Sequence, residues 1–271
     1  MKTKNYLSVV ACMKDEGPNL EEWLEFHKLV GVDHFYLYDN ESSDNTKDIL
    51  EPYIQAGEVS YFFTDMDQCQ FACYYNALTA FRDQSAWMAF IDLDEFLFSP
   101  EGDLKENLKE FEAKAPGIAV NEVFFGSNGH LTRPEGLVVE SYTKRQKDGD
   151  KHIKSICQPQ FTVCPANNPH SFLYGGGAPV TENNEVCQGA FTETHSSNKF
   201  RIHHYYVKSY EEYERKLTRG RADVPRRHPE FRYTTGLGRR LEDSFKESND
   251  VEDTILLKYV DELKERMNEK N

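Results

Sequence analysis

Long apolar runs are absent from this sequence of 271 residues. No stretch approaches the roughly 20 consecutive apolar residues that a membrane-spanning helix needs. Near the start, Tyr6–Met13 is too short and too polar at its flanks to be a secretory signal peptide. We therefore expect a cytoplasmic protein whose only contact with a membrane would be peripheral, at its inner face.

An excess of basic residues is also absent, because 32 Lys and Arg are outnumbered by 46 Asp and Glu, giving a net charge of −14. Proteins whose main partner is a nucleic acid bind its phosphates chiefly through Lys and Arg. The composition therefore argues against nucleic acid as a partner. A phosphate-bearing ligand would need a local group of cations or a metal ion.

The six cysteines include no Cys-x-x-Cys pair. This spacing excludes a zinc knuckle, and the low cysteine content excludes a dense disulfide framework. We interpret the cysteines as buried thiols in a reducing compartment.

The first half of the chain alternates short apolar runs with amphipathic helical patterns. This alternation is typical of β-α-β units around a mainly parallel central sheet flanked by helices, so we predict an α/β fold. The predicted strands are Leu7–Cys12, His34–Tyr38, Glu58–Phe63, Trp87–Ile91 and Ile118–Phe125.

Capping residues predict where the helices begin. Asn19 is the expected N-cap of the first helix, with Glu22 reaching back to it. Ser43 or Asp44 caps the second helix, and Pro52 bends or ends it. Further helices are predicted at Gln68–Arg82, Asp103–Lys114, Tyr210–Leu217 and Val251–Lys270.

Beyond Gly126 the chain becomes rich in Gly, Asn, Pro and Ser. Loop-rich segments of this kind usually carry binding specificity. One strand is predicted at Lys199–Lys208, and Arg219–Arg240 is a basic connection to the last helix.

Two acidic residues, Asp92 and Asp94, directly follow the predicted strand Trp87–Ile91. An extended backbone would point both side chains to the same side, at the strand end where α/β sheets bind ligands. Oxygen ligands suit Mg²⁺ or Mn²⁺, which also bridges the phosphates of a nucleoside diphosphate. The alternative is a solvated turn, but the apolar Phe96 and Phe98 that follow favour a site.

Asp39 ends the second predicted strand and precedes the helix cap. Its carboxylate can accept a hydrogen bond from a base imide or a ribose hydroxyl. The alternative is a turn in which the Asp39 side chain binds its own backbone a few residues on.

An ordered set of segments resembles glycosyltransferase family 92 and the related bacterial branch of glycosyltransferase family 2. Such a set is more specific than any single motif. It runs from about Leu7 to Arg221 and comprises Val10–Glu16, Glu22–His27, Gly31–Asn40 with Ser42 and Asp44, Asp92–Phe96, Phe125–Ser127, Lys154–Ile156, His204 with Tyr205, and Ser209 with Glu212, Lys216, Arg219 and Gly220.

The resemblance implies a GT-A fold, a Rossmann-like nucleotide-binding half joined to an acceptor half. It also implies inverting, Mn²⁺- or Mg²⁺-dependent transfer of a sugar from a nucleotide sugar, commonly UDP-galactose. The acceptor would be a glycan or lipid-linked glycan in surface polysaccharide or glycoconjugate synthesis. By this resemblance the metal ligands are Asp92, Asp94 and His204. The residues that bind the donor are Cys12, Lys14, Glu16, Asp39, Asn40, Asp92 and Lys154.

The same resemblance divides the chain. Residues 1–222 would form the glycosyltransferase domain, with its nucleotide-binding part at about 1–125 and its acceptor part at about 126–222. Residues 223–271 would add the basic connection and a C-terminal amphipathic helix. Eukaryotic relatives of this family tend to be membrane-anchored. The sequence shows no anchor, which favours an intracellular, bacterial setting and weakens the inference to galactose.

Two functional assignments require a choice between candidate residues. Adjacent strand residues point to opposite faces, so only one of His203 and His204 can reach the metal, and the resemblance favours His204. An inverting transfer also needs a base for the acceptor hydroxyl. Glu135 and Glu193 are candidates for this base, because they lie in loop-like segments. Glu122 and Glu140 lie on predicted strands, where they could instead be paired surface acids.

Two other functions fit parts of the pattern. A nucleotidyltransferase that makes an activated sugar would carry a loop rich in Gly and Arg or Lys after the first strand, and Met13–Gly17 is not such a loop. A non-catalytic module that binds a glycan or a protein partner on the same fold predicts donor binding that is indifferent to metal.

Overall fold

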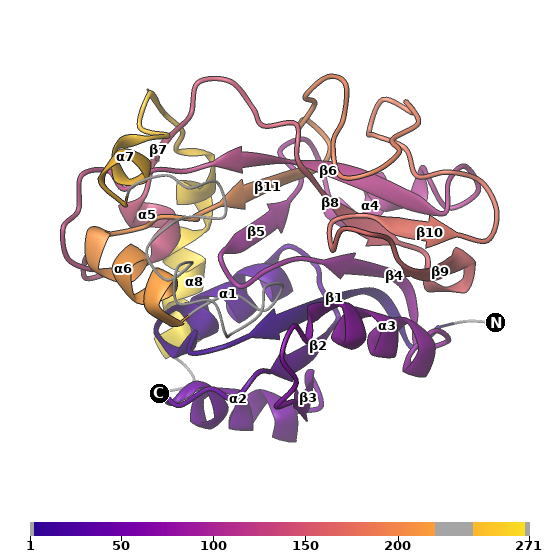
Figure 1. Cartoon of the computed structure of the whole chain (residues 1–271), viewed down its shortest axis with the longest axis horizontal. Helices are drawn as coiled ribbons and strands as arrows, with labels where there is room; N and C mark the ends of the chain where they lie inside the picture. Colours follow the sequence, from indigo (N-terminus) through magenta and orange to yellow (C-terminus); the bar gives the residue numbers. More distant parts are fainter. Residues whose placement is uncertain (1–2, 220–240, 269–271) are drawn as a thin grey trace.

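The central feature of the protein is one eight-stranded sheet with the order β3-β2-β1-β4-β8-β6-β11-β5 (Figure 1). The structure is a computed structural model that describes residues 3–219 and 241–268. The strands of this sheet are β1 Asn5–Met13, β2 His34–Asp39, β3 Val59–Phe63, β4 Ser85–Phe90, β5 Glu95–Phe98, β6 Gly117–Phe124, β8 Ile153–Cys157 and β11 Arg201–His204.

Most neighbouring strands in this sheet are parallel. β1 pairs in parallel with both β2 and β4, β2 with β3, and β6 with β11. β8 lies antiparallel between β4 and β6, and β5 lies antiparallel to β11 at the edge. The predicted α/β class with a mostly parallel sheet is therefore confirmed.

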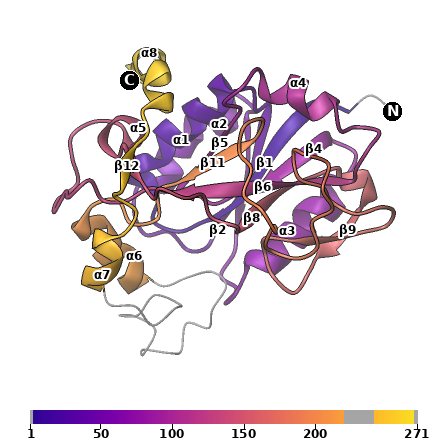
Figure 2. The same cartoon turned by 90° about the horizontal axis from the view of Figure 1, so that it is seen from above.

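Helices cover both faces of the sheet, as Figure 2 shows with α3 on the side opposite α1 and α4. The helices are α1 Gly17–Leu29, α2 Thr46–Gln55, α3 Gln70–Ala80, α4 Leu104–Lys109, α5 Val138–Ser141, α6 Tyr210–Arg219, α7 Leu241–Lys246 and α8 Val260–Asn268. Smaller elements are the hairpin β9 Thr162–Pro165 with β10 Phe172–Tyr174, the pair β7 Lys144–Arg145 with β12 Val251–Glu252, and the 3-10 turns Pro159–Phe161 and Ile255–Tyr259.

Each face of the sheet has its own core. Val9 of β1 packs in the cluster that contains Trp23 of α1, whereas Val10 packs in the cluster that contains Tyr74 of α3. This alternation explains why β1 reads as a nearly continuous apolar run, because a strand covered on both faces has no solvated side. In the described ranges, no helix has the length and apolar character needed to cross a bilayer.

The start of α1 differs from the prediction. Asn19 does not cap α1, which begins at Gly17 with Pro18 in its first turn. Glu22 instead reaches another helix, because its buried carboxylate accepts hydrogen bonds from the backbone N–H groups of Val138 at 2.7 Å and Val139 at 3.0 Å. Glu22 therefore satisfies the first donors of α5, a contact between segments 116 residues apart that no local pattern could indicate.

Neither proposed residue occupies the N-cap position of the second helix, which is Asn45, although Asp44 beside it binds the first turn. The Asp44 carboxylate accepts from the backbone N–H of Thr46 at 3.0 Å, in the first turn of α2. Ser43 instead donates to Asp15. Pro52 lies inside the helix, which ends at Gln55.

The end of the chain also differs from the predicted helix Val251–Lys270, which is wrong at its start, because residues 251–254 are not helical. Val251 and Glu252 pair with β7, and only α8 from Val260 is an α-helix. The reason is an ion pair, because the Asp253 carboxylate lies 2.8 Å from Nε of Arg145 and holds this segment against β7. Residues 220–240 of the predicted basic connection lie outside the described residues.

Glu22→Ala should lower the free energy of unfolding by about 2 kcal/mol, because two buried N–H groups at the start of α5 lose their acceptor. Urea unfolding followed by circular dichroism measures this change. The exposed Glu265 of α8 provides the control, and Glu265→Ala should change stability by less than about 0.5 kcal/mol. Equal effects of the two substitutions would contradict the role of Glu22.

Candidate active site

The carboxyl ends of β2, β1, β4, β6 and β11 lie at one edge of the sheet, because these strands run in the same direction. This edge gathers Asp39 at the end of β2, Cys12 near the end of β1, Asp92 after β4 and His204 at the end of β11. β8 runs the opposite way and brings Lys154, its second residue, to the same edge. Most of the residues that the sequence nominates thus share one region.

Three of the gathered groups form a possible metal site. One ligand atom each from Asp94, Glu95 and His204 falls within 4.8 Å of the others, and all three residues are buried. Two carboxylates with one imidazole are oxygen and nitrogen ligands, which suit Mn²⁺ better than a soft ion. Glu95 joins this group although the sequence interpretation did not include it.

The backbone conformation at Asp92 and Asp94 differs from the prediction. The predicted extended conformation is wrong, because both residues lie in the turn between β4 and β5, after which the chain folds back as a new strand. Each carboxylate has its own lysine. Asp92 lies 2.6 Å from Nζ of Lys154, and Asp94 forms an ion pair with Lys216 of α6.

The two neighbouring histidines point to opposite faces, as predicted. Nδ1 of His204 lies 2.8 Å from Glu122, and its Nε2 lies 3.6 Å from Asp94. His203 instead packs against the rings of Phe98 and Phe125. Burial lowers the pKa of His203 to about 3, so that it stays neutral. Only His204 therefore faces the acidic group.

Glu122 of β6 is not a surface acid, as the sequence had indicated, but a buried partner of His204. It also lies 3.7 Å from Nδ1 of His170. A carboxylate that holds one ring nitrogen of a histidine fixes the ring so that the other nitrogen can bind a metal. Glu122 therefore has the position of an orienting residue. Its signal in the sequence is a charged side chain inside the apolar strand Ile118–Phe125.

Charge balance sets the protonation of this buried group. Burial would raise the pKa of Asp94, but Lys216 and His204 outweigh it and hold that pKa well below its usual value. Burial raises the pKa of Glu95 to about 8, although Lys154 opposes it. Burial opposes the charge of His204, but the three carboxylates around it raise its pKa to about 10. Asp94 is thus ionised and neutralised by Lys216 and the His204 imidazolium, whereas Glu95 is protonated at neutral pH.

The other predicted donor residues lie along the same edge. Hydrogen bonds from Cys69 and Cys73, with burial, raise the pKa of Cys12 well above its usual value, so Cys12 brings no charge. The Asp39 carboxylate accepts from Ser42 N–H at 2.8 Å and from the Tyr61 hydroxyl at 2.7 Å. The alternative predicted for Asp39, a turn held by its side chain, is therefore present.

Asn40, Lys14 and Glu16 have contacts within the chain. The Asn40 side chain donates to the backbone carbonyls of Thr64 and Met66. The Lys14 carbonyl and the Glu16 carboxylate both accept from Arg219. Arg219 thereby ties the end of α6 to the loop after β1, and the donor contacts of these residues stay a prediction.

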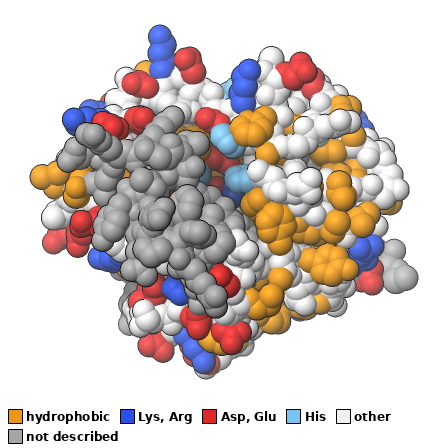
Figure 3. Space-filling view, viewed as in Figure 1, with side chains coloured by type: hydrophobic (Ala, Val, Ile, Leu, Met, Phe, Trp, Pro, Cys, Tyr) orange, Lys and Arg blue, Asp and Glu red, His pale blue; other side chains and the backbone are white. Residues whose placement is uncertain are grey.

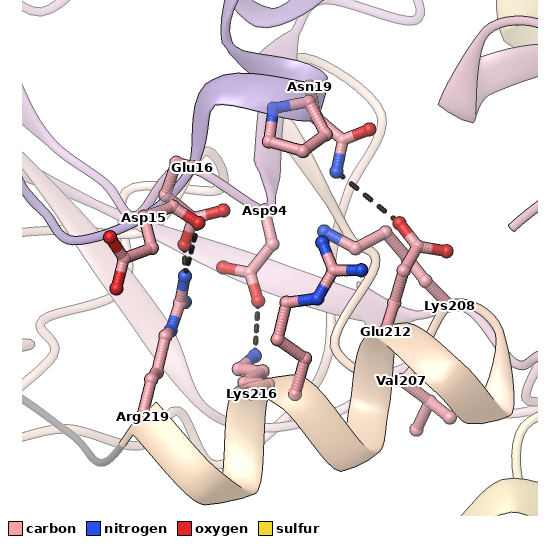
Figure 4. Close-up of a pocket in the computed structure, with 11 residues that line it drawn as sticks. Asp15, Glu16, Asn19, Asp94, Val207, Lys208, Glu212, Lys216 and Arg219 are labelled. Carbon is pink, nitrogen blue, oxygen red and sulfur yellow. Dashed lines mark hydrogen bonds and ion pairs between the residues drawn. The ribbon is translucent and has the colours of Figure 1, made fainter. Parts of the chain in front are cut away.

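A cavity lies between the loop after β1 and helix α6 (Figure 4). Figure 4 shows Lys216 and Arg219 reaching from α6 toward Asp94 and Glu16. On the face shown in Figure 3, acidic and histidine side chains gather in a hollow. The cavity combines the acidic groups with cations, as an anionic ligand with a metal would require, and is lined by Asp15, Glu16, Pro18, Asn19, Asp94, Val207, Lys208, Glu212, Arg215, Lys216 and Arg219.

The structure places both base candidates at exposed loop positions. Glu135 lies in the loop of Arg133, whose guanidinium donates to Asn19 beside the cavity. Glu193 follows Thr192, whose hydroxyl accepts from Asn121, the neighbour of Glu122. Neither glutamate lines the cavity. Their role as a base therefore stays a prediction.

Comparison with known proteins gives consistent matches. The family model described as glycosyltransferase family 92 matches residues 8–270. A glycosyltransferase family 92 protein of Ricinus communis is 28% identical over 159 residues, which cover 57% of this chain and 29% of that protein. A galactan beta-1,4-galactosyltransferase of Arabidopsis thaliana is 32% identical over 104 residues, 34% of this chain and 21% of that protein. The chain thus matches less than a third of the length of these curated relatives.

Solved structures show more distant similarity. Staphylococcus aureus TarS, residues 1–349 with UDP, aligns with a TM-score of 0.38 and 14% identity over 58% of this chain and 47% of that chain. Glucosyl-3-phosphoglycerate synthase of Mycobacterium tuberculosis with Mn²⁺, UDP and glucosyl-3-phosphoglycerate aligns with a TM-score of 0.30 and 18% identity, over 44% of each chain.

Lys154→Met should destabilise the protein by about 3 kcal/mol at pH 9, because Glu95 is ionised there and the substitution leaves its buried carboxylate without its lysine. The penalty should shrink at pH 6, because burial raises the pKa of Glu95 to about 8 and Glu95 is then protonated. Urea unfolding at both pH values measures this. Lys144→Met, at an exposed position of β7, is the control, and equal penalties at the two pH values would contradict the argument.

Proposed function

The chain belongs to glycosyltransferase family 92, and from this membership we propose that it transfers a sugar from a UDP-sugar to a glycan acceptor in surface polysaccharide or glycoconjugate synthesis. The observation that carries the proposal is the buried group Asp94, Glu95 and His204 beside a cavity whose other wall supplies Lys216 and Arg219. A diphosphate needs this combination, a site for a divalent cation and nearby positive side chains.

Asp94 and His204 would hold Mn²⁺ or Mg²⁺, with Asp92 and Glu95 as neighbouring carboxylates. The residues fit such an ion, because Nδ1 of His204 is held by Glu122 while its Nε2 faces Asp94. When bound, the ion would neutralise negative charge that grows on the departing diphosphate.

Two basic side chains would change partners when the donor binds. Lys216 and Arg219 now form ion pairs with Asp94 and Glu16. A metal at Asp94 would take over the neutralisation of that carboxylate, which leaves Lys216 available for a phosphate oxygen. Lys154 is buried between Asp92 and Glu95 and would keep their separation fixed.

The nucleoside would lie beside the ends of β1 and β2. We assign Cys12, Lys14, Glu16, Asp39 and Asn40 to the surroundings of the nucleoside. All five lie in the proposed donor part, at about residues 1–125, and the proposed acceptor part follows at about 126–222. The galactan galactosyltransferase of Arabidopsis thaliana is the basis for naming UDP-galactose as the first donor to test.

An inverting transfer also requires a carboxylate that takes the proton of the acceptor hydroxyl. Glu135 and Glu193 are our candidates, from loops on two sides of the site. Both are exposed. An exposed position is compatible with this role, because a large glycan acceptor would approach the site from solvent.

UDP should bind in the presence of Mn²⁺ and lose affinity when EDTA is added, as measured by calorimetry. Glu122→Gln should weaken Mn²⁺ binding by roughly 10–100-fold, because His204 loses the group that orients it, and Asp94→Asn should weaken it further. Asp83→Asn is the matched control, because Asp83 is exposed and precedes β4 at the end opposite Asp92.

Two results would overturn the proposed function. One is wild-type protein with Mn²⁺ that neither transfers nor hydrolyses any common UDP-sugar while Asp94→Asn binds UDP as wild type does. The other is UDP binding that chelation leaves unchanged, which would favour a non-catalytic module.

The base candidates can be separated by their effects on two reactions. Replacement of the true base by glutamine should reduce sugar transfer by roughly 10²-fold or more and leave UDP affinity unchanged, because the base acts only on the acceptor. Glu135→Gln and Glu193→Gln are compared with each other in the same assay. If both variants transfer sugar at the wild-type rate, neither residue is the base.

A further inference from the structure

A second group of metal-binding side chains lies at the same sheet edge, but it consists of sulfur atoms. The thiols of Cys12, Cys69 and Cys73 all fall within 4.8 Å of one another. Cys69 and Cys73 are buried, and Cys12 is partly exposed. The other three cysteines, Cys157, Cys164 and Cys187, are not part of this group.

The fold brings these thiols together from two elements. Cys12 lies near the end of β1, Cys69 is the residue before α3, and Cys73 follows it by one helical turn. Residues four apart on a helix share a face, so both thiols of α3 point toward β1. No Cys-x-x-Cys pair is needed when a strand supplies the third sulfur, so this group has no local signal in the sequence.

Three convergent thiols differ chemically from the carboxylate group. Thiolates prefer soft or borderline cations such as Zn²⁺ or Cu⁺, whereas carboxylates prefer Mg²⁺ and Mn²⁺. Zinc binds sulfur at about 2.3 Å in a tetrahedral arrangement, which places neighbouring sulfurs just under 4 Å apart. Small rotations of these side chains reach that geometry from separations within 4.8 Å.

We propose that Cys12, Cys69 and Cys73 form a binding site for a thiophilic cation of the Zn²⁺ type, with its fourth position open on the side of Cys12. The ion would link the end of β1 to the start of α3. Each of the three thiols would lose its proton to solvent as its sulfur forms a bond to the ion.

The site would also affect the candidate active site through one residue. Gln70, between Cys69 and Cys73, donates from Nε2 to the Asp92 carboxylate at 3.2 Å and to the Tyr74 hydroxyl at 3.1 Å. An ion that fixes the first turn of α3 therefore also fixes the amide that holds Asp92. The thiol site would stabilise the acidic turn without contributing a ligand to the hard metal.

Cobalt binding to the full chain tests the proposal. Reduced protein, freed of metals, should bind one equivalent of Co²⁺ with thiolate-to-cobalt charge-transfer absorption, which Zn²⁺ abolishes and excess Mn²⁺ leaves in place. Cys12→Ser and Cys73→Ser should each lose this absorption. Cys157→Ser, which removes a buried cysteine outside the group, should keep it.

A folding check and one further variant keep the test decisive. Cys73 is buried, so Cys73→Ser is checked for folding by circular dichroism; Cys12 is partly exposed, and Cys12→Ser decides alone if the other variant unfolds. Asp94→Asn should retain the cobalt absorption even if it loses Mn²⁺-dependent UDP binding, which separates this site from the proposed function. Absence of the absorption in wild type, or its survival in Cys12→Ser, would overturn the proposal.

Discussion

Burial of negative charge is the constraint on which the rest of this structure depends. Asp94, Glu95 and Glu122 are all removed from water, and an isolated buried carboxylate costs far more free energy than a single contact returns. Each acid is therefore accompanied by a cation from a different element. Lys154 comes from β8, His204 from β11 and Lys216 from α6. The sheet order that puts β8 and β11 beside these acids is thus also an electrostatic requirement.

Helix α1 holds the edge strand that carries Glu95 in place. The indole N–H of Trp23 donates to the carbonyl of Glu95 at 2.8 Å. One turn later, Nδ1 of His27 lies 2.8 Å from the Trp23 carbonyl, and its Nε2 accepts from the backbone N–H of Leu97 at 3.1 Å. Burial lowers the pKa of His27 to about 3, so its neutral form persists and Nε2 remains an acceptor. The segment Glu22–His27, which carries part of the family resemblance, is therefore a support for the site.

Local sequence patterns predicted the features that depend on local physics. The apolar runs predicted strands β1 to β4. The alternation of side chains along β11 predicted that His204 and His203 point to opposite faces. Features that need distant partners escaped prediction. Lys216 meets Asp94 across 122 residues, and β5 exists because the chain folds back and pairs with β11. Glu122 looked like a surface acid because its partner, His204, lies 82 residues away.

The same edge of the sheet offers two kinds of ligand, and their hardness would keep two metal ions apart. Carboxylate and imidazole at Asp94, Glu95 and His204 select a hard or borderline ion, which can exchange waters for phosphate oxygens. Sulfur from Cys12, Cys69 and Cys73 selects a thiophilic ion of the Zn²⁺ type. Gln70 follows Cys69 in the chain and donates to Asp92 of the acidic turn, so it connects the two groups. The ion at the thiols would therefore hold the acidic turn in place, whereas the ion at the carboxylates would bind the diphosphate. The two ions would use separate sets of ligands.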